Sequence, residues 1–220
     1  AMARANLEVR TGALVERVLF EGRRAVGVEY RVGGERRVAR AADQVILSAG
    51  AVNSPQILQL SGIGPGETLR AAGIEVLHGN DAVGGGLQDH LGISYFYRAT
   101  EPTLNQALGT WSGRVRAGLQ YLATRGGPLS LSVNQMGGMV RSAPQLRRPD
   151  QQLYFNPLSY SVETKGRRPL LKPDPWPGFI LSFNPCRPAS TGRIAIASAD
   201  PAAAPLIRPN YLATDGDIAD

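Results

Sequence analysis

Residues 43–64 read DQVILSAGAVNSPQILQLSGIG, and this stretch carries the clearest folding pattern in the sequence. Residues 43–50 form a short apolar run that ends in small residues, which is typical of a strand buried on both faces of a sheet. After it, Ser54 is a suitable N-cap and Pro55 suits the first turn of a helix. The apolar helix positions continue to Gly62, where glycine favours the end of the helix. The stretch therefore predicts a strand, a tight turn and a helix in direct succession.

The chain shows one pattern up to about residue 91 and another after it. The earlier part predicts a meander of antiparallel strands with a hairpin turn at Gly33 and Gly34, the strands spanning residues 7–11, 15–20, 25–31 and 36–41. The later part predicts a helix at 111–124, a proline-rich loop at 169–177, and strands at 93–99, 151–160, 178–184 and 193–198. The change of pattern predicts a domain boundary near residue 92.

The composition permits a buried core and argues against several classes of function. Hydrophobic residues make up 43% of the 220 residues, and no run of about 18 apolar residues predicts a membrane span. The net charge of +6 comes almost entirely from scattered arginines without a nucleic-acid-binding signature, so no nucleic-acid partner is expected. Cys186 is the only cysteine, which excludes an intrachain disulfide, and no metal site is predicted. The first residues lack the apolar core of a signal peptide, so we expect a cytoplasmic location, with peripheral attachment to a membrane left open.

The small residues between the predicted strand and helix have two physical interpretations. They allow backbone N–H groups to approach a phosphate or a flat ring closely. They are equally compatible with an ordinary strand-to-helix connection that has a capped helix. The residues by themselves leave both interpretations open.

The same stretch resembles the second signature of the glucose–methanol–choline (GMC) oxidoreductase family. That signature has a glycine, a small residue, Ser or Thr followed by Pro, two aliphatic residues, and then Ser-Gly-aliphatic-Gly. Every position is matched here, by Gly50, Ala51, Ser54, Pro55, Ile57, Leu58, Ser61, Gly62, Ile63 and Gly64. The resemblance extends to residues 6–15, 24–30, 83–84, 87–90, 190–196, 198–201 and 209–212. One departure is Gly86, which stands where the family usually has Asn or another polar residue.

The resemblance implies an FAD enzyme that takes a hydride from an alcohol carbon. It implies a mixed α/β and α+β chain, in which residues 1–91 are the later part of a doubly wound FAD-binding domain. Residues 92–220 would be a substrate-binding domain on an antiparallel sheet, with the start of the C-terminal region. The implied cofactor contacts are Val15, through its backbone at the adenine end, Ser48, Ala49 and Gly50 beside the ADP part, and Asn53 and Ser54 nearby. A plain core valine is the alternative for Val15.

Two parts of such a site are absent from the sequence. No Gly-x-Gly-x-x-Gly with an acidic residue about 20 positions later occurs, and residues 84–86 do not form that motif. The two histidines are His78, expected at the surface, and His90, which matches a recurrent Asp-His pair and is expected to be structural. The family's catalytic His is expected C-terminal to this chain, so no residue here is assigned as catalytic. We therefore expect an internal piece of a longer protein that is inactive alone and needs its remaining segments.

The resemblance also suggests substrate contacts. The segment 132–137 is similar to a family region that faces the substrate cavity, and choline-oxidising members place a carboxylate near Gln135. A neutral Gln does not offer that ion pair, so choline is not expected to be the preferred substrate. Asn156 and Phe183 are further candidates for the cavity wall, with ordinary strand packing as the alternative.

Three functions remain open at this stage. The first is an FAD-dependent alcohol dehydrogenase or oxidase, whose partners are an alcohol and an electron acceptor such as oxygen or a quinone. The second is a non-redox lyase of the same fold that keeps FAD as a structural element. The third is an inactive fragment that needs a partner chain.

Overall fold

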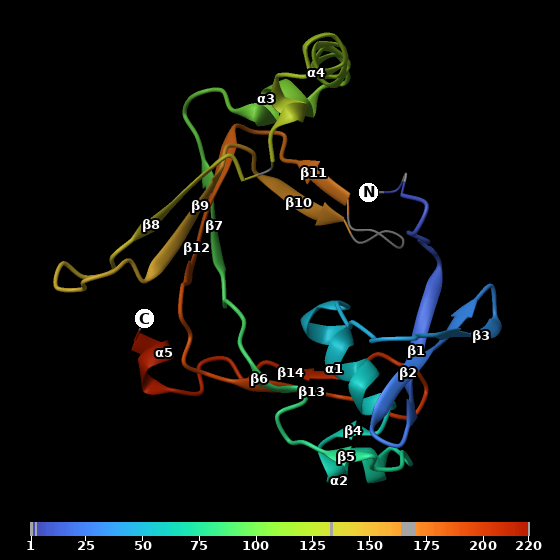
Figure 1. Cartoon of the computed structure of the whole chain (residues 1–220). Coiled ribbons are helices and arrows are strands. Elements are labelled where there is room, and N and C mark those ends of the chain that lie inside the picture. The colour runs from blue at the N-terminus through green and yellow to red at the C-terminus, as the bar shows by residue number, and fades with distance from the viewer. Residues whose placement is uncertain (1, 3, 133, 164–169, 220) are drawn as a thin grey trace. The chain divides into compact units, whose positions relative to one another are not determined.

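The computed structural model describes residue 2 and residues 4–132, 134–163 and 170–219 (Figure 1). It divides into two compact units. The first contains the residues up to Gln88 together with Ser190–Ala213, and the second contains Asp89–Ala189 and the residues from Thr214 onward. The return of 190–213 to the first unit was not anticipated from the sequence. The assignment of an FAD-binding and a substrate-binding domain to the chain stays a prediction.

The first unit begins with an antiparallel meander. Strands β1 (Ala13–Glu21), β2 (Arg24–Val32) and β3 (Glu35–Arg40) lie in the order β1-β2-β3. The hairpin between β2 and β3 turns at Gly33 and Gly34, which both have positive φ, as the sequence predicts. The strand expected at residues 7–11 is wrong, because those residues have no strand assignment.

The buried strand expected at residues 43–50 is also wrong for this structure. Residues 44–48 belong to no strand, and the side chain of Ile46 is 74% exposed. A strand buried on both faces needs hydrogen-bonded neighbours along both edges. None of the described residues pairs with this segment, so its apolar pattern has no sheet to enter.

The helix after this segment, α1, spans Gly50–Leu60 and so begins earlier than the sequence suggested. Its N-cap is Ala49 rather than Ser54, and Pro55 lies inside the helix. The hydroxyl of Ser54 instead accepts a hydrogen bond from the Ala49 N–H at 3.0 Å, from within the helix. The predicted end is confirmed, since Ser61 is the C-cap and Gly62 follows with φ +84°.

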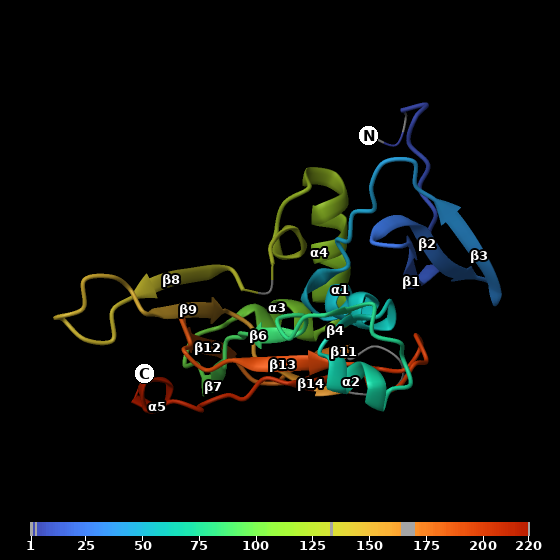
Figure 2. The same cartoon turned by 60° about the horizontal axis from the view of Figure 1, so that its bottom comes forward.

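Two small sheets complete the first unit. After α1, β4 (Ile63–Gly64) pairs in parallel with β5 (His78–Gly79), and α2 (Gly66–Ala71) lies between them in the chain. A three-stranded sheet has the order β14-β13-β6, and its strands are Leu206–Arg208, Gly192–Ala195 and Gly85–Leu87 (Figure 2). The pairing of β13 with β6 therefore brings the segment after residue 190 beside the end of the first part of the chain.

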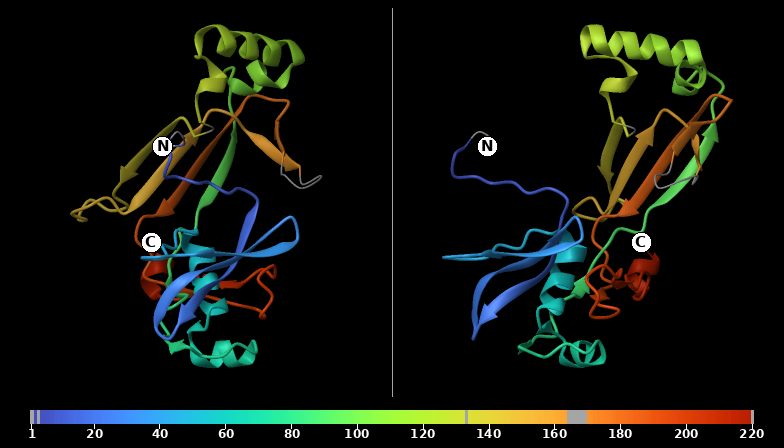
Figure 3. Two further views of the ribbon diagram at one scale, coloured as in Figure 1. Left: turned by 45° about the vertical axis from the view of Figure 1, so that its right-hand side comes forward. Right: turned by 90° about the vertical axis from the view of Figure 1, so that its right-hand side faces the viewer.

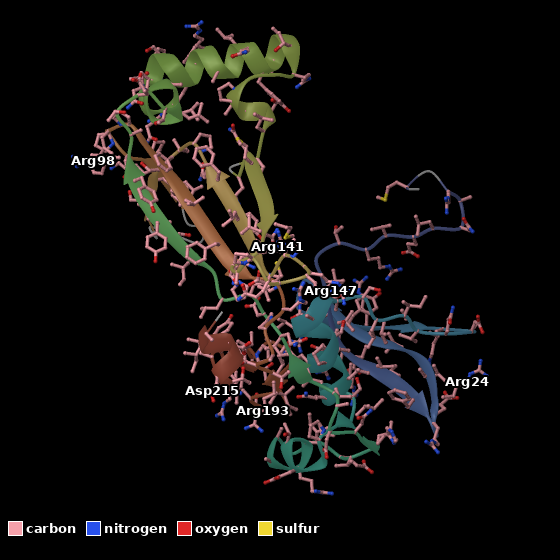
Figure 4. All side chains as sticks on the ribbon, turned by 90° about the vertical axis from the view of Figure 1, so that its left-hand side faces the viewer. Arg24, Arg98, Arg141, Arg147, Arg193 and Asp215 are labelled. Atoms are coloured by element: carbon pink, nitrogen blue, oxygen red, sulfur yellow. The ribbon has the colours of Figure 1, made fainter. Side chains whose placement is uncertain are left out.

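The second unit is built on a four-stranded antiparallel sheet. Its order is β7-β12-β9-β8, and these strands span Ile93–Arg98, Gly178–Pro185, Gln151–Asn156 and Met136–Val140. At the end of β7, Arg98 lies over the ring of Trp176 at 4.5 Å (Figure 4 labels Arg98). The expected strand 151–160 ends at Asn156, and a hairpin of β10 (Tyr160–Glu163) and β11 (Leu170–Pro173) follows. Part of the proline-rich stretch is thus a strand, and residue 169 lies outside the described residues.

Helices lie at one end of this sheet (Figure 3). They are α3 (Leu104–Gly109), which has a capping box of Thr103 and Gln106, and α4 (Trp111–Thr124), whose span matches the prediction. A 3₁₀ turn (Pro128–Ser130) follows α4, and α5 (Asp215–Ala219) lies near the end of the chain. Within the described ranges, no helix is both long enough and apolar enough to span a bilayer.

Candidate cofactor site

A mainly apolar cavity of about 490 Å³ lies in the first unit between α1 and the glycine-rich segment that leads into β6. The α1 side contributes Ala51, Ser54, Pro55 and Leu58. The remaining wall consists of Asn80, residues 82–88 and Ile194. Of the predicted cofactor contacts, Ser54 lines this cavity directly.

The first turn of α1 adjoins the cavity and presents its backbone. Ser48, Ala49, Gly50 and Asn53 are exposed, and no side chain caps the helix. A Cβ atom placed on Gly50, which has φ +84°, would meet no atom within 4 Å. The first N–H groups of a helix have no partner within it, and the helix dipole makes this end favourable for an anion. The arrangement suits a phosphate group better than a cation.

The opposite wall is a run of three glycines, Gly84, Gly85 and Gly86. Gly84 has φ +82°, and a Cβ atom there would lie 2.1 Å from the carbonyl oxygen of Ile194, so no larger residue fits. Gly86 has φ +66° and open space where a Cβ would stand. Gly86, where the family usually has Asn or another polar residue, thus contributes backbone and no side chain to the cavity wall.

A buried glutamine joins the two walls. Gln59, on α1, is fully buried, and its Nε2 donates to the carbonyl oxygens of Val83 at 3.2 Å and Ile194 at 3.0 Å. Its Oε1 accepts from the Ile196 N–H at 2.8 Å. Sequence reasoning missed Gln59, although an amide between Leu58 and Leu60 was a visible signal.

Val15 does not line this cavity. It is half-buried on β1 opposite Tyr30, next to an irregularity in the strand pairing between Val15 and Arg17. The neighbouring Glu16 is only 4% exposed and forms ion pairs with Arg31 at 2.6 Å and Arg36 at 2.9 Å. Desolvation alone would raise the pKa of Glu16, but hydrogen bonds and charges from the two arginines outweigh it and lower that pKa.

The predicted substrate contacts lie on the sheet of the second unit, but not all on one face. Asn156 pairs with Ile180, and the alternation along β12 puts Phe183 on the other face. There Phe183 stacks on Tyr95, with ring centroids 5.7 Å apart. Gln135 precedes β8 and donates its N–H at 3.1 Å to the carbonyl oxygen of Phe155, the residue that also pairs with Met136. Val133, in the same segment, lies outside the described residues.

The remaining candidates show no catalytic arrangement. His78 is exposed on β5, and His90 is exposed with its Nε2 3.2 Å from the carbonyl oxygen of Cys186. The Cys186 thiol lies 3.6 Å from the sulfur of Met139. Among the described residues, no group of three or more His, Cys, Asp or Glu side chains is arranged to hold a metal ion.

The site fits part of a dinucleotide such as FAD. An open helix N-terminus, a glycine wall without side chains and a largely apolar cavity suit a phosphate next to a flat group. The pyrophosphate-binding glycine motif is absent from the sequence, so these residues offer only a portion of the contacts that such a cofactor requires.

Comparisons with known proteins show which family this chain is similar to. Residues 1–92 match the family model described as GMC oxidoreductase. The chain is 40% identical to the mitochondrial choline dehydrogenase of Homo sapiens over 220 residues, which is 100% of the chain and 36% of that protein. It is 38% identical to the oxygen-dependent choline dehydrogenase of Photobacterium profundum over 218 residues, or 99% of the chain and 37% of the relative. The chain thus spans little more than a third of the length of these relatives.

Solved structures share the fold. A formate oxidase matches with a TM-score of 0.81 at 24% identity, covering 94% of this chain and 40% of that chain. The pyridoxine 4-oxidase from Mesorbium loti matches with a TM-score of 0.74 at 26% identity, covering 98% of this chain and 37% of that chain. Sequence and fold thus lead to one family: the chain is similar to GMC oxidoreductases, through the family model over residues 1–92 and through these relatives along the whole chain.

Proposed function

We propose that the protein carrying this chain is an FAD-dependent oxidoreductase that acts on the CH–OH group of alcohols. The observation that carries the proposal is the cavity between α1, next to its open N-terminus, and the glycine wall. All 220 residues of this chain align with a choline dehydrogenase, at 40% identity.

The proposed contacts follow from the positions of the residues. The exposed N–H groups at Gly50 would hold an anionic part of the cofactor, with Ser48 and Ala49 beside it. Asn53 and Ser54 would lie along the same part, and the backbone of Val15 would contact the adenine end. When bound, FAD supplies the acceptor for the hydride that leaves the alcohol carbon.

In the second unit, Asn156 and Gln135 would face the substrate, and Phe183, on the opposite face of the sheet from Asn156, would act from that side or through packing. Neither of the two histidines lines the cofactor cavity, so we assign the base that takes the hydroxyl proton to a part of the protein outside this chain. The electron acceptor is proposed to be oxygen, a quinone or another oxidant. For the location we propose the cytoplasm, and cell fractionation separates this from attachment to a membrane.

The test uses the full-length protein. It should purify yellow, and anaerobic addition of a primary alcohol should bleach the flavin absorbance as the cofactor is reduced. A protein without flavin contradicts the proposal. A flavin that no alcohol reduces, in a protein that catalyses an elimination, supports a lyase that keeps FAD as a structural element.

A further inference from the structure

We propose that Gln59 is a positioning residue for the cofactor, because its buried amide holds the glycine wall at a set distance from α1. This inference rests on the proposed function, because the proposed function makes FAD the occupant of that cavity. Gln59 does not line the cavity itself and would act through the backbone of residues 83–86.

The hydrogen bonds of Gln59 use both ends of its amide. The Nε2 group donates to two carbonyl oxygens, at Val83 and Ile194, and Oε1 accepts one N–H, at Ile196. The side chain has no measurable exposure, so water cannot replace these bonds when the amide is lost. The amide is therefore the direct link from α1 to both the glycine wall and β13.

Two glycines leave the space that the Gln59 side chain occupies. A Cβ atom on Gly84 would lie 2.7 Å from Nε2 of Gln59, and one on Gly64 would lie 2.9 Å from its Cγ. The Ile194 N–H also donates to the Gly84 carbonyl oxygen at 2.7 Å. Gln59 and Gly84 are thus both hydrogen-bonded to Ile194, so a displacement of Gln59 would reach Gly84 through Ile194 and Val83.

A glycine wall needs such an external restraint. Three consecutive glycines have many accessible backbone conformations, and no side chain of their own to select one of them. Helix α1 contributes both the opposite wall of the cavity, through Ala51 and Ser54, and the restraint, through Gln59. Helix α1 and the hydrogen bonds of its Gln59 side chain thus set the width of the cavity.

The experiment compares Gln59→Leu with Gln56→Leu in the full-length protein. Gln56 is a matched control, because it lies on the same helix and its Nε2 also donates to a backbone carbonyl, that of Ala203 at 2.9 Å, but it does not line the cavity. We expect Gln59→Leu to weaken FAD binding by about tenfold or more, which corresponds to the loss of one or two buried hydrogen bonds. It should also shift the flavin absorbance bands and speed amide hydrogen exchange at residues 83–87. In Gln56→Leu, all three measurements should stay within about twofold of the wild type, even where both variants lose similar thermal stability.

The conservative variant Gln59→Glu provides a second measurement, the pH dependence of FAD affinity. A role of Gln59 in stability alone would not produce such a dependence. Gln59→Glu keeps the shape and the acceptor oxygen, but an ionised carboxylate would face two carbonyl oxygens. A protonated carboxyl group can still donate one hydrogen bond. We therefore expect the FAD affinity of Gln59→Glu to rise as the pH is lowered from 8 to 6, with no such change in Gln59→Leu. If Gln59→Leu does not fold, this variant carries the test.

The outcomes separate this inference from the proposed function. If the wild type binds flavin and Gln59→Leu matches it in affinity, spectrum and exchange, the role of Gln59 is refuted. If the wild type contains no flavin, the proposed function fails, and amide exchange at residues 83–87 alone decides about Gln59. Unchanged exchange in that case refutes the positioning role as well.

Discussion

At the scale of single residues, the first unit buries a charged side chain, Glu16, that the hydrophobic pattern does not indicate. Glu16 lies in the buried register of β1, with its carboxylate held by Arg31 and Arg36. The sequence predicts a strand at residues 25–31, in which Tyr30 is 5% exposed, but it contains no sign that Arg31 pairs with Glu16. The stability of the meander therefore depends on this ion pair as well as on its apolar side chains.

Replacing Glu16 tests this dependence. Glu16→Gln should lower the free energy of unfolding of the first unit by about 1–3 kcal/mol, because it removes two charge-assisted hydrogen bonds from a buried acceptor. Denaturant titration of the chain measures the change. Glu21→Gln is the control, since the pair of Glu21 with Arg40 is exposed on both sides and should contribute less than about 1 kcal/mol. Equal losses in the two variants would contradict the assignment.

The same carboxylate predicts a pH dependence. Because the pKa of Glu16 is lowered below its ordinary value of 4.5 in the folded chain, its contribution is complete above that pH. The contribution is lost as the pH falls through the lower folded-state pKa. The stability difference between the wild type and Glu16→Gln should therefore be constant near neutral pH and shrink on acidification below 4.5. A stability difference that grows on acidification would contradict a lowered pKa of Glu16 in the folded chain.

At the scale of elements, α4 shows how much a local pattern can specify. Its bounds, its end near Gly126 and its apolar stripe all follow from the sequence, and the left-handed Arg125 closes the helix. What the pattern does not specify is the close approach of α3. A Cβ atom on Gly113 would lie 1.9 Å from the Ala107 carbonyl oxygen, whereas one on Gly118, further along α4, would meet nothing within 4 Å.

These two glycines make a matched pair for mutation. Gly118→Ala should stabilise the second unit by up to about 1 kcal/mol, because alanine is the better helix former. Gly113→Ala should destabilise it by about 1–3 kcal/mol, since α3 must move away to admit the methyl group. Thermal unfolding followed by circular dichroism measures both. Shifts of the same sign and size would mean that α3 does not pack against α4 as described.

At the scale of the whole molecule, the proposed cofactor site has some of the features that a dinucleotide requires and lacks one of them. The glycine wall and the N-terminus of α1 are present, while a pyrophosphate-binding glycine motif is absent from the sequence. The chain spans 36% of the human relative.

The isolated 220-residue chain should accordingly bind FAD only weakly, with a dissociation constant above about 1 μM, and should not oxidise alcohols. Titration of FAD with the chain, followed by flavin fluorescence, measures the affinity. Binding below one micromolar would show that this chain holds the cofactor without the missing motif.

Substrate charge provides a second prediction at this scale. Gln135 is neutral, so the full-length protein should have a higher kcat/KM for an uncharged primary alcohol than for choline. Gln135→Glu should raise kcat/KM for choline relative to the neutral alcohol by about tenfold, through attraction to the trimethylammonium group. Steady-state kinetics with the two substrates decides the matter. Choline turnover equal to or better than that of the neutral alcohol would overturn the prediction.

The features that sequence reasoning predicted correctly depend on residues within a few positions of one another. Local patterns predicted β1, β2, β7 and β12, the two glycines closed the β2–β3 hairpin, and Gly62 marked the end of α1. The signature at residues 50–64 identified the family for the same reason, since its residue types and their spacing can be read along one segment.

Long-range contacts account for what local patterns missed. Helix α1 begins at Gly50 rather than near Ser54, and residues 44–48 stay outside any sheet among the described residues. Gln59 bonds to a residue 135 positions away, and β13 returns to pair with β6. Such contacts form when the folded chain brings distant backbone groups into a buried space, where each needs a hydrogen-bond partner. The amino-acid pattern along the chain thus specified the elements and the family, whereas the burial of distant polar groups against each other specified the cavity and the residue that holds its wall.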